Sequence, residues 1–384
     1  MHRSVRGAAP LAAGILLAAV YVLGYGSHTL PAQVQGNDFV AQESASGEIG
    51  RVYLFGGAAH TVCLDGKSGR EIWSVKAPGL SQQASPGAGP ILAGKTLVYM
   101  GGGGFLTAYG LDAETGKTEW SLDKRSVALA AGRGTVFLAT DGGLGVMAID
   151  AQTGKVKWER RAVRMGGSVT NMAYAGGRLY TDSPWVWDAS AGRVAARLSA
   201  DPGAVTATAE RVFVLGDNIP LIALDARASK TLWEQKSPSP SPHEHADDFM
   251  GASSRYVAAA SYDGNAFEAH RGVLDVYDAA TGRTLWTKTI TSATGLLPNP
   301  VSADDHFVYL LEPGGKSGTG TVVMAFDGTT GEEVWSYAAK RLSGPVAPVG
   351  DVALVSGDEG PAPEYTTLYA LNRKTGSLLW KFSF

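Results

Sequence analysis

The sequence predicts an all-β protein, and three observations lead to this prediction. Glycine makes up 50 of the 384 residues, and glycine adopts the positive φ angles that tight turns require. Many short segments alternate apolar and polar residues, which is the pattern of strands with one buried face. A hairpin-turn signature also recurs from residue 65 to residue 380. Recurrence at a near-constant period indicates a repeat architecture.

The composition is that of a folded globular protein without a nucleic-acid partner. Hydrophobic residues make up 45% of the chain and charged residues 18%, so a sizeable core is available. The formal net charge is −3 with no long basic run, and binding to nucleic acid is therefore not expected. Cys63 is the only cysteine. It excludes an intrachain disulfide and is expected to be a half-buried strand residue.

The N-terminus predicts export. Arg3 and Arg6 precede an apolar run over residues 8–23, the charge asymmetry of a signal peptide. Residues 1–26 are expected to be either a cleaved signal peptide or a retained membrane anchor, because the run is long for the former and slightly short for the latter. Residues 27–48 are polar and aperiodic and are expected to be a linker. The protein is thus expected in the periplasm or outside the cell, or anchored to the outer side of the cytoplasmic membrane.

The repeat reads Asp-x-x-x-Gly-x-x-x-Trp and predicts a β-propeller over residues 49–384. Each copy lies between two alternating segments, as expected of a hairpin turn. Copies start 37 to 53 residues apart, near the length of four short strands. We therefore predict eight four-stranded antiparallel blades, with seven blades as the alternative. The eight copies start at Asp65, Asp112, Asp150, Asp188, Asp225, Asp278, Asp327 and Asn372.

The residue types of the repeat have physical reasons. An Asp side chain accepts backbone N–H groups of its own turn, and Gly four residues later takes the left-handed conformation. The Trp is expected on the outermost strand, packed against the next blade with its indole N–H on a backbone carbonyl. The ring is expected to close through a strand from residues 38–48 or through the C-terminal strand. The expected docking residues are Trp73, Trp120, Trp158, Trp233, Trp286, Trp335 and Trp380.

Copies such as residues 148–158 resemble the tryptophan-docking repeat of the pyrroloquinoline-quinone-like (PQQ-like) propellers. The resemblance covers roughly residues 50–384 and implies either a quinoprotein dehydrogenase or a non-catalytic, BamB-like protein. The dehydrogenase alternative implies an adjacent cysteine pair and a calcium site with a catalytic aspartate. Cys63 alone cannot supply the pair. We therefore expect no cofactor and no catalytic residues, and we place the chain in the BamB-like branch.

One loop has the residue types of a metal site. His243, His245 and Asp247 follow a Pro/Ser-rich run, and imidazole and carboxylate groups are suitable zinc ligands. Such a loop, however, offers no surrounding groups to orient the rings. A solvated loop is the preferred interpretation.

Loop charges suggest a contact face. Loops joining second to third strands and loops joining blades share one end of a propeller. There they can receive a partner of complementary charge or merely keep the protein soluble. The candidate contact residues are Arg161, Arg164, Trp185, Asp217, Asp263 and Glu312.

The fourth and fifth repeats depart from the pattern. Ala196 stands at the docking position of the fourth copy, and Ser229 replaces Gly in the fifth. The indoles of Trp185 and Trp187 either fill the volume left by Ala196, or Trp185 stands at a loop mouth as a contact aromatic. The contacts between neighbouring blades are expected to be weakest at these two repeats.

The function that we expect is an exported, non-catalytic scaffold that binds a protein or a cell-envelope component. One alternative is an oxidoreductase that uses PQQ or another small ligand. Another is a BamB-like assembly factor for outer-membrane proteins, although that family is anchored by a lipid-bearing cysteine that has no counterpart near residues 1–26. Propellers host many activities, so the repeat alone decides none of these.

Overall fold

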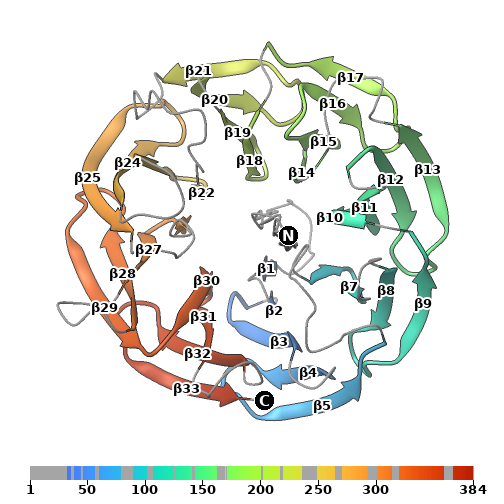
Figure 1. The fold of residues 1–384 in the computed structure, drawn as a ribbon, viewed down its shortest axis with the longest axis horizontal. Coiled ribbons are helices and arrows are strands. Elements are labelled where there is room, and N and C mark those ends of the chain that lie inside the picture. The colour runs from blue at the N-terminus through green and yellow to red at the C-terminus, as the bar shows by residue number, and fades with distance from the viewer. Residues whose placement is uncertain are drawn as a thin grey trace, which may run out of the picture.

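The strands of this protein form eight sheets arranged around a central axis (Figure 1). The structure is a computed structural model, and the residues it describes are 33–35, 39–44, 46–56, 60–78, 90–101, 107–124, 126–140, 143–161, 169, 171–199, 202–216, 219–235, 249–263, 270–292, 301–313, 320–358 and 366–383.

The first four blades run in chain order. Blade 1 has β2 (Phe39–Glu43), β3 (Ile49–Gly56), β4 (His60–Asp65) and β5 (Glu71–Lys76), with β1 (Gln33–Gln35) added beside β2. Blade 2 has β6 (Ile91–Ala93), β7 (Thr96–Gly101), β8 (Thr107–Asp112) and β9 (Thr118–Leu122). Blade 3 has β10 (Ser126–Gly132), β11 (Thr135–Thr140), β12 (Gly145–Asp150) and β13 (Val156–Arg161). Blade 4 has β14 (Met172–Ala175), β15 (Arg178–Thr181), β16 (Trp185–Asp188) and β17 (Val194–Arg197).

The remaining blades follow the same order. Blade 5 has β18 (Ala204–Ala207), β19 (Arg211–Gly216), β20 (Ile219–Asp225) and β21 (Thr231–Gln235). Blade 6 has β22 (Phe249–Ala252), β23 (Tyr256–Asp263), β24 (His270–Asp278) and β25 (Thr284–Ser292). Blade 7 has β26 (Val301–Ala303), β27 (Phe307–Pro313), β28 (Thr321–Asp327) and β29 (Glu333–Ala339). Blade 8 has β30 (Leu342–Val349), β31 (Val352–Asp358), β32 (Thr366–Asn372) and β33 (Leu378–Ser383).

The eight-bladed, all-β prediction is confirmed. Each blade is an antiparallel meander whose first strand lies near the axis and whose last strand lies at the rim (Figure 1). The expected linker is wrong for residues 39–43, because β2 is the innermost strand of blade 1. A strand from residues 38–48 was one of the two expected ways to close the ring, and β2 lies within that range, where it pairs with β3.

Ring closure also differs from the expectation. Strand β2 pairs with β1 and β3, and β33 pairs with β32, so both ends of the propeller stay within their own blades. Among the described residues no strand joins the sheets of two blades. Blades 1 and 8 lie side by side as the blue and red ends of the ring (Figure 1). Side chains of Leu54, Leu64, Leu354 and Trp380 share one buried cluster across this seam. The ring is therefore closed by side-chain packing.

The turns between third and fourth strands are built as their sequence suggests. In blade 2, Asp112 Oδ1 accepts the backbone N–H of Thr115 at 2.8 Å and its hydroxyl at 2.7 Å. The Gly116 N–H donates to the Asp112 carbonyl at 2.8 Å. The seven glycines at this position have φ between 61° and 74°, the left-handed region that glycine occupies without strain. The nine-residue signature thus specifies its own turn.

The repeated tryptophans lie across the seams between blades. Six indole N–H groups donate to the carbonyl that follows the turn Asp or Asn of the next blade. The six pairs are Trp120 with Ala151 at 2.8 Å, Trp158 with Ala189 at 3.0 Å, Trp233 with Ala279 at 3.1 Å, Trp286 with Gly328 at 3.0 Å, Trp335 with Arg373 at 2.8 Å and Trp380 with Gly66 at 3.0 Å.

The same indoles cover the left-handed glycine of the next blade. A Cβ atom at any of the seven glycines would lie 2.4 to 2.9 Å from an indole carbon. This position therefore needs glycine for two reasons, the positive φ angle and the close approach of the ring.

Trp73 docks without its hydrogen bond. Its ring carbons lie over Gly116 of blade 2, but its buried N–H has no hydrogen-bond partner among the described residues. The Ala113 carbonyl, which holds the equivalent position, accepts Arg51 Nη1 at 3.4 Å instead. Beneath the ring lies Cys63, which pairs with Trp73 across β4 and β5. Cys63 is fully buried rather than half-buried, and burial raises the pKa of its thiol to about 12.

The hydrophobic core lies in the seams. Seven buried clusters account for the core, and each draws residues from neighbouring blades rather than from one sheet. In the part of the chain that the structure describes, no helix is long or apolar enough to cross a membrane. The expected signal peptide or anchor at residues 1–26 lies outside the described residues.

We predict that the indole hydrogen bond is measurable by comparing two seams. Trp380→Phe makes the ring smaller and removes the hydrogen bond to the Gly66 carbonyl. Trp73→Phe makes the ring smaller by the same amount but removes no hydrogen bond, because the Trp73 N–H has no partner among the described residues. Urea unfolding should show Trp380→Phe as the more destabilising change by about 1 kcal/mol, the net value of one hydrogen bond. Equal losses of stability would contradict this account of the seam.

We predict that the turn carboxylates make stability fall in acid. Hydrogen bonds from Thr115, Thr153 and Thr281 hold the pKa values of Asp112, Asp150 and Asp278 below the usual 3.8. A lowered folded-state pKa stabilises the protein fully above pH 3.8, and this contribution is lost progressively as the pH falls below 3.8 through the lowered folded-state pKa.

The test replaces these three aspartates with Asn, which already forms the equivalent turn at residue 372. Urea midpoints at pH 7 and pH 3 should differ less in the triple variant than in the wild type. An unchanged difference would show that other carboxylates cause the acid dependence.

Candidate functional site at the seam between blades 4 and 5

The seam between blades 4 and 5 is the only one of eight whose repeat sequence lacks the docking Trp. Ala196 of β17 pairs with Val186 of β16. In the other blades the Trp at this position pairs in most cases with a small residue, such as Gly110 or Ala148. The larger Val186 replaces only part of the missing volume. This seam is held by a different contact.

Tyr180 of β15 supplies that contact. Its hydroxyl lies 3.0 Å from the Ala226 carbonyl and 3.3 Å from the Asp225 carbonyl. Ala226 directly follows the turn Asp of blade 5, so its carbonyl is the acceptor that an indole uses at six other seams. The ring of Tyr180 is fully buried, and burial raises the pKa of its hydroxyl to about 12. The hydroxyl is therefore a stable neutral donor in the physiological range.

Ser229 completes the substitution. Its Oγ lies 2.9 Å from the Tyr180 hydroxyl, and its φ of 55° keeps the left-handed conformation. A side chain is tolerated here because no indole covers the position. The losses of Trp at 196 and of Gly at 229 therefore have one steric cause. In the sequence, Ala196 and Ser229 together indicated that this seam differs from the others. Tyr180 gave no such indication, because aromatic residues also occupy the same strand position in blades 1, 3, 5 and 7.

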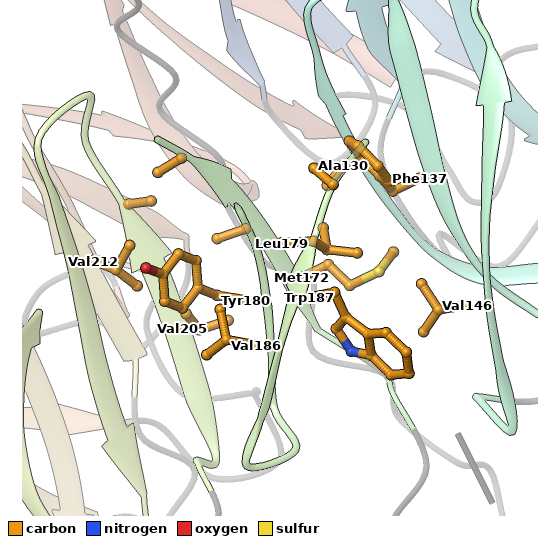
Figure 2. Close-up of a cluster of buried hydrophobic side chains, with 14 of the residues drawn as sticks. Ala130, Phe137, Val146, Met172, Leu179, Tyr180, Val186, Trp187, Val205 and Val212 are labelled. Carbon is orange, nitrogen blue, oxygen red and sulfur yellow. The ribbon is translucent and has the colours of Figure 1, made fainter. Parts of the chain in front are cut away.

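The displaced indoles do not fill the volume left by Ala196. Figure 2 shows Trp187 on the opposite side of the sheet from Tyr180, beside Val146 of blade 3 and Met172. Its N–H has no hydrogen-bond partner among the described residues. The half-buried Trp185 lies under the guanidinium of Arg197, with 5.3 Å from Cζ to the ring centroid. The first of the two interpretations of these tryptophans is therefore wrong.

A cavity of about 210 Å³ remains in this seam. Its apolar wall comes mainly from blade 5, and its polar rim comes from both blades. Arg197, Ser199 and Thr231 on that rim are exposed, so the cavity opens to solvent. The apolar residues are Leu198, Val214, Ile222 and Leu224, and the polar ones are Arg197, Ser199, Ser229 and Thr231.

The candidate contact residues are only partly described. Arg161 ends β13 and is exposed, and Glu312 lies in β27 and is half-buried. The backbone of Asp263 ends β23. Arg164 and Asp217 lie outside the described residues, as do the candidate metal ligands His243, His245 and Asp247. Among the described residues no three His, Cys, Asp or Glu side chains form a group that could hold a metal ion.

Two buried carboxylates are hydrogen-bonded to side chains of their own blades. Asp304 accepts the Tyr309 hydroxyl at 2.7 Å and lies 3.4 Å from Arg373 Nη1 of blade 8. Asp275 accepts the Thr287 hydroxyl, and burial raises the pKa of this carboxyl. Both are under 10% exposed. Their partners are structural groups of the blades.

The residues do not fit the quinone site implied by the dehydrogenases of the PQQ-like class. That site uses two adjacent cysteines, and the single Cys63 lies under Trp73 in the seam between blades 1 and 2.

We predict that Ala196 and Ser229 are energetically coupled. Ala196→Trp alone should destabilise the protein, because the new indole meets the Ser229 Cβ. Ser229→Gly added to Ala196→Trp should remove this overlap, fill the cavity and give a favourable coupling of about 1–3 kcal/mol in a double-mutant cycle. Urea unfolding of the four proteins measures it. Additive effects would show that the cavity is not the place of the missing indole.

Comparison with known proteins gives one family match and many structures of similar fold. The family described as outer membrane protein assembly factor BamB matches residues 33–179, 161–303 and 318–384. No protein among those of curated function matches the chain.

Three solved structures are reported as similar, and the two with TM-scores above 0.5 share the fold. A quinohemoprotein alcohol dehydrogenase from Comamonas testosteroni is 12% identical over 86% of this chain and 72% of its own, with a TM-score of 0.57. The computationally designed Ika8 protein is 17% identical over 76% and 85%, with a TM-score of 0.55. BamB from Moraxella catarrhalis is 18% identical over 90% and 87%, with a TM-score of 0.43.

These identities are low enough that the structures show the fold alone. The family match carries more, since its three ranges span most of the chain. The chain therefore belongs to the family described as outer membrane protein assembly factor BamB, within the PQQ-like propellers that its repeats resemble.

Proposed function

We propose that this protein is an exported, non-catalytic scaffold that binds a protein of the cell envelope. The observation that carries the proposal is the family match over residues 33–303 and 318–384. The description of the family names a role in the assembly of outer-membrane proteins, and such a role requires contacts with other proteins. The charge asymmetry of residues 1–26 supports export.

The use of the polar side chains supports a scaffold. In the described seams six indole N–H groups and the side chains of Tyr180, Asp304 and Arg373 bind partners within the protein. Such contacts hold the blades in a fixed arrangement and present their ends as rigid surfaces. Rigid elements position a binding surface more exactly than loops on a mobile support.

The proposed binding face is the end of the ring that holds Arg161. This residue pairs with Gly145, which pairs in turn with Thr140, so all three lie at one end of blade 3. Arg133 lies in the turn at the opposite end and is also exposed. A face bearing charges of both signs can steer and orient a partner of complementary charge.

The finer proposal is a BamB-like factor in the assembly of outer-membrane proteins. The description of the matched family favours this role over other scaffold roles. The partner would then be an outer-membrane protein or a component of its assembly machinery.

We predict that a partner contacts the Arg161 end of the ring. A photo-crosslinking amino acid at position 161 of the full chain, expressed in the cells that naturally make it, should give one dominant cross-linked envelope protein. The matched control at position 133 places the same group at the other end of blade 3 and should not give that product.

Two results would overturn the scaffold proposal. One is equal cross-linking of the same proteins from positions 161 and 133, which would indicate non-specific proximity. The other is alcohol-dependent dye reduction by the purified protein that saturates with added quinone and calcium, which would make it an enzyme.

A further inference from the structure

Six of the eight turns between third and fourth strands carry a basic residue at the same position. This residue directly follows the left-handed one, and its carbonyl accepts the backbone N–H of the turn Asp at 2.8 or 2.9 Å. Because the backbone hydrogen bonds of these turns are the same, the six side chains begin at equivalent places on successive blades and therefore at one level of the ring. All six are exposed: Arg70, Lys117, Lys155, Arg193, Lys230 and Arg283.

Basic residues are in excess at this end of blades 3 to 6. The turns between first and second strands lie at the same end and add the exposed Arg133 and Arg255. The turn aspartates of these blades accept backbone N–H groups of their own turns. Glu210 is the only other carboxylate in these turns, all of which are described. The basic arc is defined here as Arg133, Lys155, Arg193, Lys230, Arg255 and Arg283.

The charges of the basic arc are available to a partner. Among the described residues no carboxylate lies within ion-pair distance of any of its six side chains. The arc ends at blade 7, where Glu332 holds the equivalent turn position and Glu333 follows it, both exposed. The chain as a whole has a formal net charge of −3. The positive charge is thus a local feature of one end of the ring, where it attracts an anionic partner.

The N-terminal segment joins the ring at the same end. Strand β1 lies near the axis, inside the blades (Figure 1). Its first residue, Gln33, pairs with Gln42, the residue before the end of β2, where the chain turns into β3. Gln33 therefore lies toward the turn end of the ring. Residues 1–32, which contain the apolar run expected to direct export, are attached on the side of the basic arc.

We infer that the basic arc lies on an anionic lipid surface. Charges held at one level by a rigid ring suit a planar partner, and the headgroups of an anionic bilayer supply a plane of negative charge. The attachment of residues 1–32 on this side favours the membrane over a soluble acidic polypeptide. The inference rests on the export that the proposed function includes, but not on the protein partner at the Arg161 end.

The experiment places one dye at either end of the full-length protein. Ala228→Cys carries it in the turn of blade 5, within the arc, and Ser199→Cys carries it after β17, at the other end of blade 4. The native Cys63 is fully buried and stays unlabelled. The vesicles are phosphatidylcholine with about one third phosphatidylglycerol and a headgroup-nitroxide lipid that quenches the dye on contact. Phosphatidylcholine vesicles with the same quencher are the neutral control.

The dye at position 228 should be quenched by the anionic vesicles only. Salt at about 1 M should remove the quenching, since the Debye length then falls to about 3 Å. The dye at position 199 should be quenched by neither kind of vesicle. Because the measurement reports contact of one end with lipid, the expected result is the same whether or not residues 1–26 also enter the bilayer.

Three neutralised charges test the arc itself. Lys155→Gln/Arg193→Gln/Lys230→Gln should reduce the quenching at position 228 to its level in neutral vesicles. Each Lys or Arg at an anionic surface strengthens binding about fivefold, so that losing three weakens it about a hundredfold. The matched control removes the same charge from exposed residues at the opposite end and should behave like the wild type: Lys76→Gln/Lys340→Gln/Arg341→Gln. Urea midpoints check that both variants fold.

The inference is overturned if anionic vesicles do not quench the dye at position 228, if neutral vesicles quench it equally, or if position 199 is quenched as strongly. It is also overturned if the arc variant behaves like the wild type. Soluble polyglutamate that abolishes the quenching at equal charge concentration would assign the arc to an acidic polypeptide instead. Failure of the cross-linking experiment at position 161 bears on the protein partner alone, so the two failures are distinguishable.

Discussion

The fold depends on one contact, an indole of one blade lying on the left-handed turn residue of the next. Within the described residues the sheets are not joined by shared strands, so the hydrogen-bonded ladders stabilise individual blades only. The buried clusters and the indole N–H bonds join the blades to one another. The contact between Trp380 and Gly66 is the same contact made between the last blade and the first. Closure of the ring thus uses no device beyond the repeat itself.

This contact also explains which residue types vary together. Gly is needed under the indole because a Cβ would overlap the ring, and a small residue is favoured opposite the Trp, since a Cβ at Gly110 would lie 2.1 Å from the Trp120 ring. Where Ala stands in place of the Trp at position 196, no ring covers position 229, and Ser229 takes the place of Gly. The seam keeps its hydrogen bond to Ala226, but the donor is now a tyrosine of a different strand. The acceptor carbonyl is equivalent to the one used at six other seams, and only the donor differs.

The exchange of donor is accompanied by a cavity in this seam. A tyrosine hydroxyl reaches the carbonyl from the interior, whereas an indole covers the rim as well. The cavity beside Ser229 is the volume that this difference leaves open.

The sequence by itself determined the number of blades and their turns, because the turn Asp or Asn of each signature forms its hydrogen bonds within the same turn, and the recurring Trp marked the docking positions. Contacts between distant residues decided the rest. Tyr180 meets Ala226 from 46 residues away, and Trp380 meets Gly66 from 314. The sequence indicated a strand within residues 38–48, but only the pairing with β3 decided that β2 is the innermost strand of blade 1. The direction of Trp187 toward blade 3 follows from the alternation of β16 once its neighbours are fixed. Local turn chemistry can be read from a short pattern, but the packing of a seam requires both blades in place.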